Sequence, residues 1–247
     1  FCLSRGLGDV YKRQVFLTTK IPAQYKAAAE QQIQESLKRL QTDQIDLLQF
    51  HEIIRMDDGY RIFRPGGAIE AALDAKKAGK VRFIGFTGHK SPHVHLKMLE
   101  IAFKRDFVFD AVMMPLNLMD AHFESFEKNV LPVLKEHNIG AIGMKPFAFG
   151  QILKSQTVSP VECLHYAMNL PVDVVVTGCE SISILEQALN AARSFKPMAE
   201  AERSALLAKT AKAAENGRFE PYKTGKQFDM TDLNPHWLGV KTVTFAR

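Results

Sequence analysis

Three side chains that could do chemistry stand at the ends of apolar segments. Lys20 closes the run VFLTTK, His51 follows IDLLQF, and Lys145 follows GAIGM. A lysine amine can attack a carbonyl group when its surroundings lower its pKa, and an imidazole can transfer a proton near neutral pH. Taken alone, each lysine is better explained as a solvated residue at a protein rim, and the histidine as a hydrogen-bonded structural residue. Their significance therefore depends on the elements that carry them.

Two glycine-containing segments could bring a ligand close to the backbone. GFTG (85–88) combines small residues with a hydroxyl group, although a tight turn between a strand and a helix explains it equally well. TGCES (177–181) precedes a predicted helix, whose free N–H groups could bind a phosphate. Both segments also follow apolar runs.

These segments belong to a repeat. Short apolar runs begin at Val15, Asp46, Val81, Ala111, Gly140 and Asp173. Their starts are separated by 31, 35, 30, 29 and 33 residues, the period of a strand–helix unit. Amphipathic helices are predicted at 23–41, 67–80, 92–106, 125–138, 159–170 and 182–195. Strands that are apolar on both faces and alternate with helices predict a parallel sheet covered by helices, either a closed (β/α)8 barrel or an open doubly wound sheet.

The number of units helps to choose between these folds. Six units are visible, and after Cys179 only helices and an irregular tail follow. We therefore predict an α/β fold, an incomplete (β/α)8 TIM barrel with strands 3–8 present, which ends in a C-terminal helix and tail over about 196–247. Functional groups of such barrels gather at the carboxyl ends of the strands, where Lys20, His51 and Lys145 stand.

Composition excludes several classes of protein. The 247 residues suit one large domain, and the net charge of 32 − 27 = +5 is scattered, unlike the basic stripe of a nucleic-acid-binding protein. The three cysteines lack metal-ligand spacing, so no metal site and a reducing, cytoplasmic compartment are expected. Since no apolar run approaches the ~18 residues of a membrane helix, no membrane partner is expected.

The order of the segments and their amino-acid sequences resemble those of the aldo-keto reductase family. VFLTTK resembles the third strand of that family with its lysine, and ESLKRLQTDQIDLLQFHE resembles its helix 3 and strand 4 with its histidine. GKVRFIGFTGH resembles the segment that members write as G-K-[VI]-R-x-[IL]-G-x-S-N. MPLNLMD, NIGAIGMKPFAFGQIL and VVVTGCESISILEQAL resemble strands 6, 7 and 8 with their cofactor loops. The resemblance is collinear over about residues 15–195.

The resemblance implies an NAD(P)H-dependent reduction of a small-molecule aldehyde or ketone to an alcohol, or the reverse. In the family a tyrosine is the general acid, a lysine lowers the pKa of the phenol, an aspartate orients the lysine, and a histidine hydrogen-bonds the carbonyl. Lys20 and His51 match the lysine and the histidine. The tyrosine and the aspartate lie before strand 3 of the family, and no matching string occurs here.

The resemblance also implies a set of cofactor-binding residues: Thr87, Gly88, Met144, Lys145, Pro146, Phe147, Gly178, Ser181 and Gln187. NADP is the expected cofactor, and NAD is the alternative, because Ile184 falls where many NADP-using members place an arginine and Glu180 adds negative charge nearby. Met113 and Met144 replace residues that usually contact the nicotinamide, so its orientation is less assured.

The first residues suggest a non-native beginning. DVYKRQ (9–14) is encoded by GATGTGTATAAGAGACAG, a transposon end used in sequencing libraries, so residues 1–14 are interpreted as a scar and 15–247 as the barrel fragment. Tyr11 is too close to Val15 for a helical crossover of at least 10–12 residues, so it cannot be the family's tyrosine. We therefore expect that two strand–helix units are missing and that the chain as written is largely inactive.

Two other functions remain open. A nucleotide-binding regulatory module without turnover would also lack the catalytic acid. A Schiff-base lyase on the same barrel would use Lys20 or Lys145 as the amine nucleophile. The sequence leaves the oligomeric state open.

Overall fold

A computed structural model describes residues 15–239; the predicted scar at 1–14 and Tyr11 lie outside the described residues. The chain divides into two compact units. Of the described residues, the first unit contains 15–88, 97–111 and 229–239, and the second contains 89–96 and 112–228. Each unit is described by itself.

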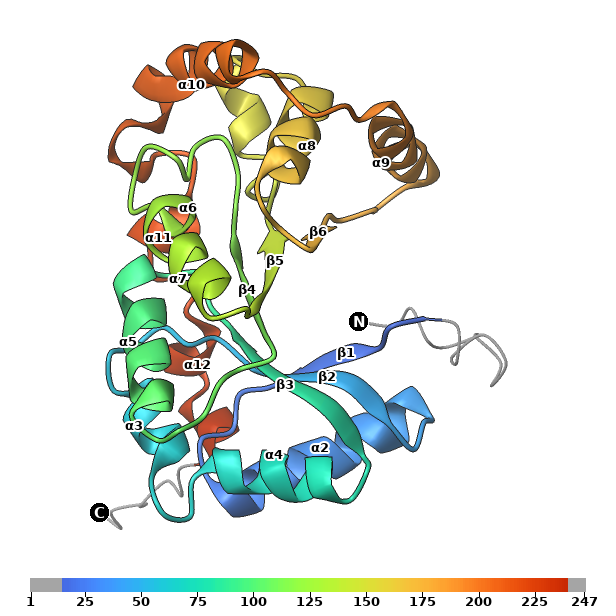
Figure 1. The fold of residues 1–247 in the computed structure, drawn as a ribbon, viewed down its shortest axis with the longest axis vertical. Coiled ribbons are helices and arrows are strands. Elements are labelled where there is room, and N and C mark those ends of the chain that lie inside the picture. The colour runs from blue at the N-terminus through green and yellow to red at the C-terminus, as the bar shows by residue number, and fades with distance from the viewer. Residues whose placement is uncertain (1–14, 240–247) are drawn as a thin grey trace, which may run out of the picture. The chain divides into compact units, whose positions relative to one another are not determined.

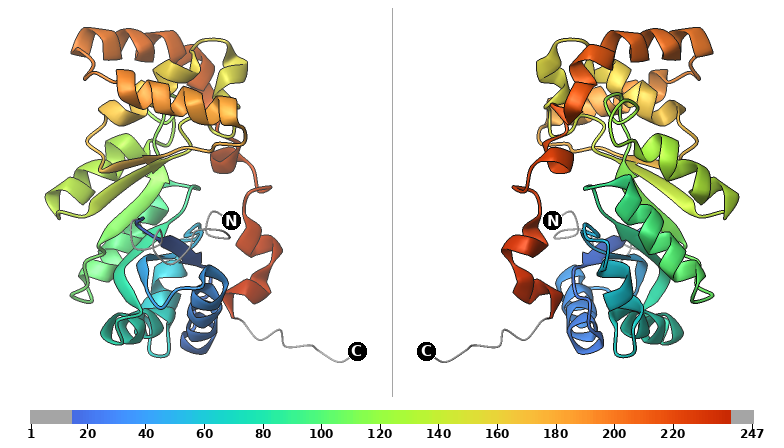
Figure 2. Two further views of the ribbon diagram at one scale, coloured as in Figure 1. Left: turned by 90° about the vertical axis from the view of Figure 1, so that its right-hand side faces the viewer. Right: turned by 90° about the vertical axis from the view of Figure 1, so that its left-hand side faces the viewer.

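Three neighbouring strands form the sheet of the first unit: β1 (Thr18–Ile21), β2 (Ile45–Phe50) and β3 (Val81–Thr87). They are parallel and hydrogen-bonded in chain order, with α2 (Lys26–Leu40) and α4 (Ala68–Lys77) as crossover helices. Figure 1 shows these two helices along one face of the strands, and Figure 2 shows them side by side. The predicted strand–helix repeat is confirmed, although β1 begins three residues later than Val15.

The helix α2 illustrates why these residues fold in this way. Its buried residues are Ala29, Ile33 and Leu37, spaced by four, so they form one apolar stripe. Lys38 and Arg39 stand in the last turn, where the helix dipole favours positive charge. Gln41 adopts a left-handed conformation with φ of 53° and ends the helix.

Aromatic rings fill the layer between the strands and the helices of the first unit. The Phe109 ring meets Phe86 at 4.8 Å, Phe107 at 5.0 Å, Phe63 at 6.0 Å and Phe50 at 6.5 Å between centroids, each time edge to face. Phe50, Phe86 and Phe109 are almost completely buried. Edge-to-face contacts add to the free energy gained by burial, so this cluster stabilises the unit.

The second unit continues the same alternation of strands and helices. Its strands are β4 (Ala111–Pro115), β5 (Gly140–Met144) and β6 (Val174–Val176), in chain order, and β5 pairs with β6 in parallel. Its longer helices are α8 (Pro160–Asn169), α9 (Ile182–Ser194) and α10 (Glu200–Ala214). The remaining elements are α6 (Phe126–Asn129), α7 (Leu131–Glu136), η1 (Ile152–Ser155), η2 (Glu215–Gly217) and α11 (Pro221–Thr224).

Two helices of the second unit show how single residues set helix boundaries. Ser159 begins α8 with a capping box, in which its hydroxyl accepts the N–H of Glu162 and the Glu162 carboxylate accepts the N–H of Ser159. The helix predicted over 125–138 is instead divided into α6 and α7 around Val130. Pro132 stands in the first turn of α7, and its missing N–H cannot continue the hydrogen bonds of α6.

Shorter elements complete the first unit. They are α3 (Asp58–Phe63), the part of α5 (Pro92–Phe103) that belongs to it, α12 (Met230–Leu233) and η3 (Pro235–Leu238). Over residues 15–239, six strands lie in chain order in the sheet and alternate with helices, which is consistent with the predicted incomplete (β/α)8 barrel. Within 15–239, the structure contains no helix that is both long and apolar enough to span a bilayer.

Candidate active site

The predicted lysine and histidine lie on one face of the sheet in the first unit. Lys20 of β1 is paired in register with Gln49 of β2, which is paired with Gly85 of β3. Paired residues of parallel strands point to the same side of a sheet, and so do residues two apart on one strand. His51 lies two residues after Gln49, and Thr87 lies two residues after Gly85. Both therefore lie on the same face as Lys20, closer to the carboxyl ends of the strands.

The backbone holds this edge of the sheet in a fixed register. The N–H of His51 donates to the carbonyl of Ile21 at 2.8 Å, and the N–H of Ile53 donates to the carbonyl of Thr87 at 2.9 Å. Thr87 is 2% exposed, whereas the His51 side chain is exposed. The three strands thus end together, and they present an imidazole that a substrate can reach.

Lys20 is exposed as a whole residue, but neighbouring protein atoms remove part of the hydration of its charged group. This desolvation lowers the pKa of Lys20, because the charged form loses more than the neutral amine. When the pKa of an amine is lowered, a larger fraction of it is neutral and nucleophilic near neutral pH. The position therefore differs from an ordinary lysine at a solvated rim.

Gln49 is a polar residue of this face that the sequence analysis missed. It is 1% exposed, its Nε2 donates to the Thr18 hydroxyl at 3.4 Å, and its Oε1 has no partner. An unsatisfied buried amide oxygen costs stability unless a ligand or water binds it. The signal was a glutamine inside the apolar run IDLLQF, on the same side as His51.

Glu52, next to His51, is a second residue that was missed. Its backbone is left-handed with φ of 59°, and its carboxylate, 4% exposed, accepts the N–H groups of Met230 and Thr231 at 2.6 Å each. Burial raises the pKa of Glu52 despite these bonds. Glu52 thereby fastens the beginning of α12 to the loop that carries the imidazole.

The predicted cofactor residues of the second unit stand at the ends of two paired strands. Met144 is the last residue of β5, opposite Val176 of β6, so Lys145 and Thr177 begin the loops at the same edge. Pro146 is buried and Phe147 half-buried in a turn in which the N–H of Ala148 donates to the carbonyl of Lys145 at 3.0 Å.

The other predicted residues lie around the beginning of α9. Gly178 is exposed, and a side chain added there would meet no atom within 4 Å, so the backbone is open to a ligand. The Ser181 hydroxyl caps the helix by accepting the N–H of Ile184 at 3.3 Å, and Gln187 is exposed in the second turn. The structure thus groups Met144–Phe147 at one loop and Gly178, Ser181 and Gln187 at the next.

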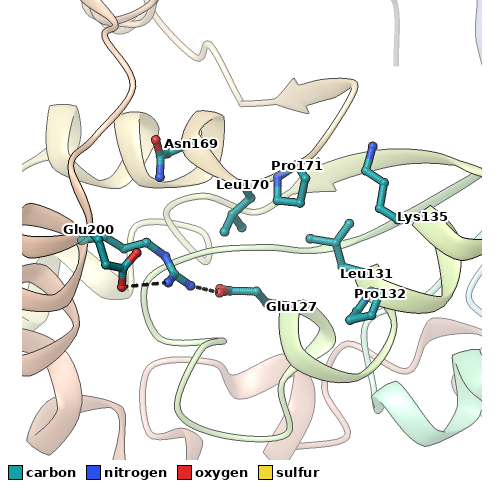
Figure 3. A pocket seen from close by; sticks show the side chains of 9 residues that line it. Glu127, Leu131, Pro132, Lys135, Asn169, Leu170, Pro171 and Glu200 are labelled. Atoms are coloured by element: carbon teal, nitrogen blue, oxygen red, sulfur yellow. Dashed lines mark hydrogen bonds and ion pairs between the residues drawn. The ribbon is translucent and has the colours of Figure 1, made fainter.

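The pocket in Figure 3 is a different feature of the second unit. It has a volume of about 390 Å³, and the Arg203 guanidinium beside it bonds the Glu127 carboxylate at 2.6 Å. None of the predicted site residues lines it. Within residues 15–239 there is no group of three or more histidine, cysteine or acidic side chains placed to hold a metal ion.

Part of the chain is similar in sequence to a curated bacterial protein. The chain is 32% identical over 125 residues to "Uncharacterized oxidoreductase YqkF" of Bacillus subtilis (strain 168). This match covers 51% of the chain and 36% of that relative, so the chain spans about a third of the relative's length.

Comparison with solved structures shows the fold. The holo form of aldo-keto reductase AKR11C1 from Bacillus halodurans superposes with a TM-score of 0.64 and 23% identity, over 85% of this chain and 77% of that one. Its apo form gives a TM-score of 0.61 and 20% identity over the same shares. The model of the aldo/keto reductase family matches residues 2–162. The chain therefore belongs to the aldo/keto reductase family.

Proposed function

We propose that this chain is built for hydride transfer between a nicotinamide cofactor, NADP or alternatively NAD, and a small aldehyde, ketone or alcohol. The observation that carries the proposal is the placement of Lys20, His51 and Thr87 on one face of β1–β3 at the same ends of the strands. Membership of the family supports an oxidoreductase. We infer the cofactor, the substrate class and the roles of the residues.

The residues present fit an anionic nucleotide. Lys145 carries a positive charge at the end of β5, and open backbone at Gly178 precedes the N-terminus of the 13-residue helix α9. A helix N-terminus and glycine together favour phosphate groups. In the first unit, the Thr87 hydroxyl would contact the nicotinamide carboxamide, and Gly88, which has no side chain, would let the cofactor approach the backbone. In the second unit, Met144, Pro146 and Phe147 would contact the cofactor at the end of β5, and Ser181 and Gln187 would contact it at the beginning of α9.

The catalytic roles follow from the chemistry of the side chains. When bound, the nicotinamide supplies or accepts the hydride. The His51 imidazole is accessible at the strand end and would hydrogen-bond the carbonyl oxygen, which orients the substrate. The Lys20 ammonium would stabilise negative charge that develops near this oxygen, and desolvation strengthens that interaction.

We also propose that the chain binds the cofactor but turns over a carbonyl substrate slowly. The resemblance implies a tyrosine acid beside the lysine. Among residues 15–239, the tyrosine nearest to Lys20 in the sequence is Tyr25, and its ring lies under the Arg64 guanidinium at 4.2 Å. With Tyr25 engaged by Arg64, proton delivery by the described residues falls to His51 or to water, and general acid catalysis of typically 10²–10⁴-fold is reduced.

Titration with NADPH and NADH, followed by an assay of nicotinamide absorbance with a panel of small aldehydes, tests the proposal. We expect saturable cofactor binding and slow turnover, which Lys20→Met and His51→Gln reduce at least ~10-fold with little change in cofactor affinity. The exposed Lys77→Met is the matched control and should behave as the unmodified chain. Absence of cofactor binding, or turnover unchanged in both variants, would contradict the proposal.

The lowered pKa of Lys20 favours one second candidate, a Schiff-base lyase. Borohydride reduction in the presence of a carbonyl compound would trap the substrate on Lys20 if this candidate is correct. Cofactor binding with no turnover by any form of the chain would instead favour a regulatory nucleotide-binding module. The cytoplasmic location stays a prediction.

A further inference from the structure

One amide side chain of the second unit joins three segments that are far apart in the sequence. Asn117, which follows β4, is completely buried, and its Nδ2 lies 3.3 Å from the Lys145 carbonyl, 3.2 Å from Glu220 Oε1 and 3.1 Å from the Tyr222 hydroxyl. Its Oδ1 accepts the N–H groups of Met119 and Asp120. We call Asn117, Glu220, Tyr222 and the Lys145 carbonyl the Asn117 network.

A buried charge cluster anchors the C-terminal part of this network. The Lys223 ammonium bonds Asp120 Oδ1 at 2.6 Å, Glu220 Oε2 at 2.9 Å and the Phe123 carbonyl at 2.8 Å. The side chains of Lys223, Asp120 and Glu220 are at most 1% exposed. Removing one partner from such a cluster leaves an uncompensated buried charge, so the segment Glu220–Lys223 is held firmly.

The turn that the network touches has a strained backbone. Lys145, Ala148 and Phe149 have φ of 59°, 45° and 58°, in the left-handed region that residues other than glycine rarely adopt. Such conformations persist only where surrounding contacts impose them, and they cluster at functional sites. The Asn117 amide on the Lys145 carbonyl is one such contact.

The aromatic rings around the turn also fix the side chain of Lys145. Its Nζ lies 3.8 Å from the centroid of Phe149 and 5.2 Å from that of Tyr222. Phe149 is itself stacked on Phe228 at 5.1 Å, with an angle of 7° between the rings. Since a free lysine side chain loses considerable entropy when it binds a ligand, holding it in advance increases affinity.

We propose that the C-terminal segment Glu220–Tyr222, bound through Asn117, is a positioning element that holds the turn Lys145–Phe149 and the Lys145 ammonium ready for a phosphate group of the cofactor. This inference rests on the proposed function, because it assigns that phosphate as the group that Lys145 meets. Tyr222 and Asn117 act through Lys145 and are positioning residues.

Two measurements test it. The first is independent of the cofactor: NMR of the chain after reductive ¹³C-methylation of its lysines, with the Lys145 resonance assigned by its loss in Lys145→Met. A ring at 3.8 Å should shift that resonance upfield of exposed lysines. Tyr222→Phe keeps the ring but removes the hydroxyl from the network, so the resonance should move towards the exposed lysines.

The second measurement is the dissociation constant of NADPH at several salt concentrations. Lys145→Met should raise it ~10-fold and reduce its salt dependence, and Tyr222→Phe should raise it ~3-fold. In the Lys145→Met background, Tyr222→Phe should have no further effect, because it acts through the lysine. Lys154 is an exposed lysine of the same unit, so Lys154→Met is the matched control. It should leave the dissociation constant and its salt dependence unchanged.

The outcomes separate this inference from the proposed function. A Lys145 resonance at the exposed position, or one that Tyr222→Phe does not move, overturns the positioning element whether or not NADPH binds. An unchanged NADPH dissociation constant in Tyr222→Phe also overturns it while the proposed function stands. A shifted resonance in a chain that binds no NADPH overturns the proposed function and supports only the holding of Lys145.

Discussion

The N–H of His51 donates to the carbonyl of Ile21 at 2.8 Å, so the backbone of His51 is bonded directly to the strand that carries Lys20. This bond continues the pairing of β1 and β2 one residue past Phe50, so the backbone positions of Lys20 and His51 are set by the sheet. A site built on strand ends is held more precisely than one built on loops.

The lowered pKa of Lys20 predicts that it reacts faster than other lysines. Desolvation increases the fraction of neutral amine at pH 8, and only the neutral amine is nucleophilic. Brief acylation followed by peptide mass spectrometry should show Lys20 modified before the exposed Lys77. Equal rates at both positions would show that the Lys20 ammonium is hydrated like any surface lysine.

Replacement of Gln49 tests whether its buried amide is left without a hydrogen-bond partner in the folded protein. Gln49→Leu removes a buried amide with an unsatisfied Oε1, so the free energy of unfolding in urea should be unchanged or ~1 kcal/mol higher. Gln49→Ala, which leaves a cavity instead, should lower it by ~2 kcal/mol. A large destabilisation by Gln49→Leu would mean that the amide is well bonded in the folded protein.

The aromatic cluster of the first unit should be sensitive at Phe109. Its ring meets four others and is 1% exposed, so Phe109→Ala should lower the free energy of unfolding by ~3–5 kcal/mol. Val108→Ala, at an adjacent side chain that is 54% exposed, is the control and should change it by less than ~0.5 kcal/mol. Similar losses at both positions would refute the assigned packing.

His95 should make the protein sensitive to acid. Burial lowers the pKa of His95 from 6.5 to about 3, so between these values the unfolded chain binds a proton that the folded chain does not. The stability contributed by neutral His95 is present above pH 6.5 and is lost as the pH falls towards 3, with a slope approaching ~1.4 kcal/mol per pH unit.

Urea unfolding at pH 7, 6, 5 and 4 measures this slope. His95→Gln should flatten it over that range, whereas His93→Gln, at an exposed histidine of α5, should not. An identical pH dependence in His95→Gln and the unmodified chain would show that His95 is not the group responsible.

The strand–helix repeat was predictable because its signals are local. Ser159–Pro160 predicts the start of α8 from two residues, and the spacing of Ile33 and Leu37 predicts the buried stripe of α2. Lys20 and His51 could be predicted as site residues because each stands at the end of an apolar run in the sequence. The structure places them next to the ends of β1 and β2, which are paired in register.

The rest depends on partners distant in the sequence. Glu52 binds residues 178 and 179 positions away, and Asn117 binds Glu220, 103 positions away, so neither role is visible in a local pattern. Gln49 was passed over because a glutamine within an apolar run reads as part of the strand. The interruption of the predicted helix at Val130 was missed because Pro132 acts on hydrogen bonds of the preceding turn.

The contacts of Asn117 also have an evolutionary consequence. Because one amide serves the carbonyl of residue 145 and the side chains of 220 and 222 at once, a change at any of the three side-chain positions leaves the others mismatched. Directed evolution of this chain should therefore randomise 117, 220 and 222 in a single combinatorial library, since stepwise replacement passes through intermediates with broken pairs.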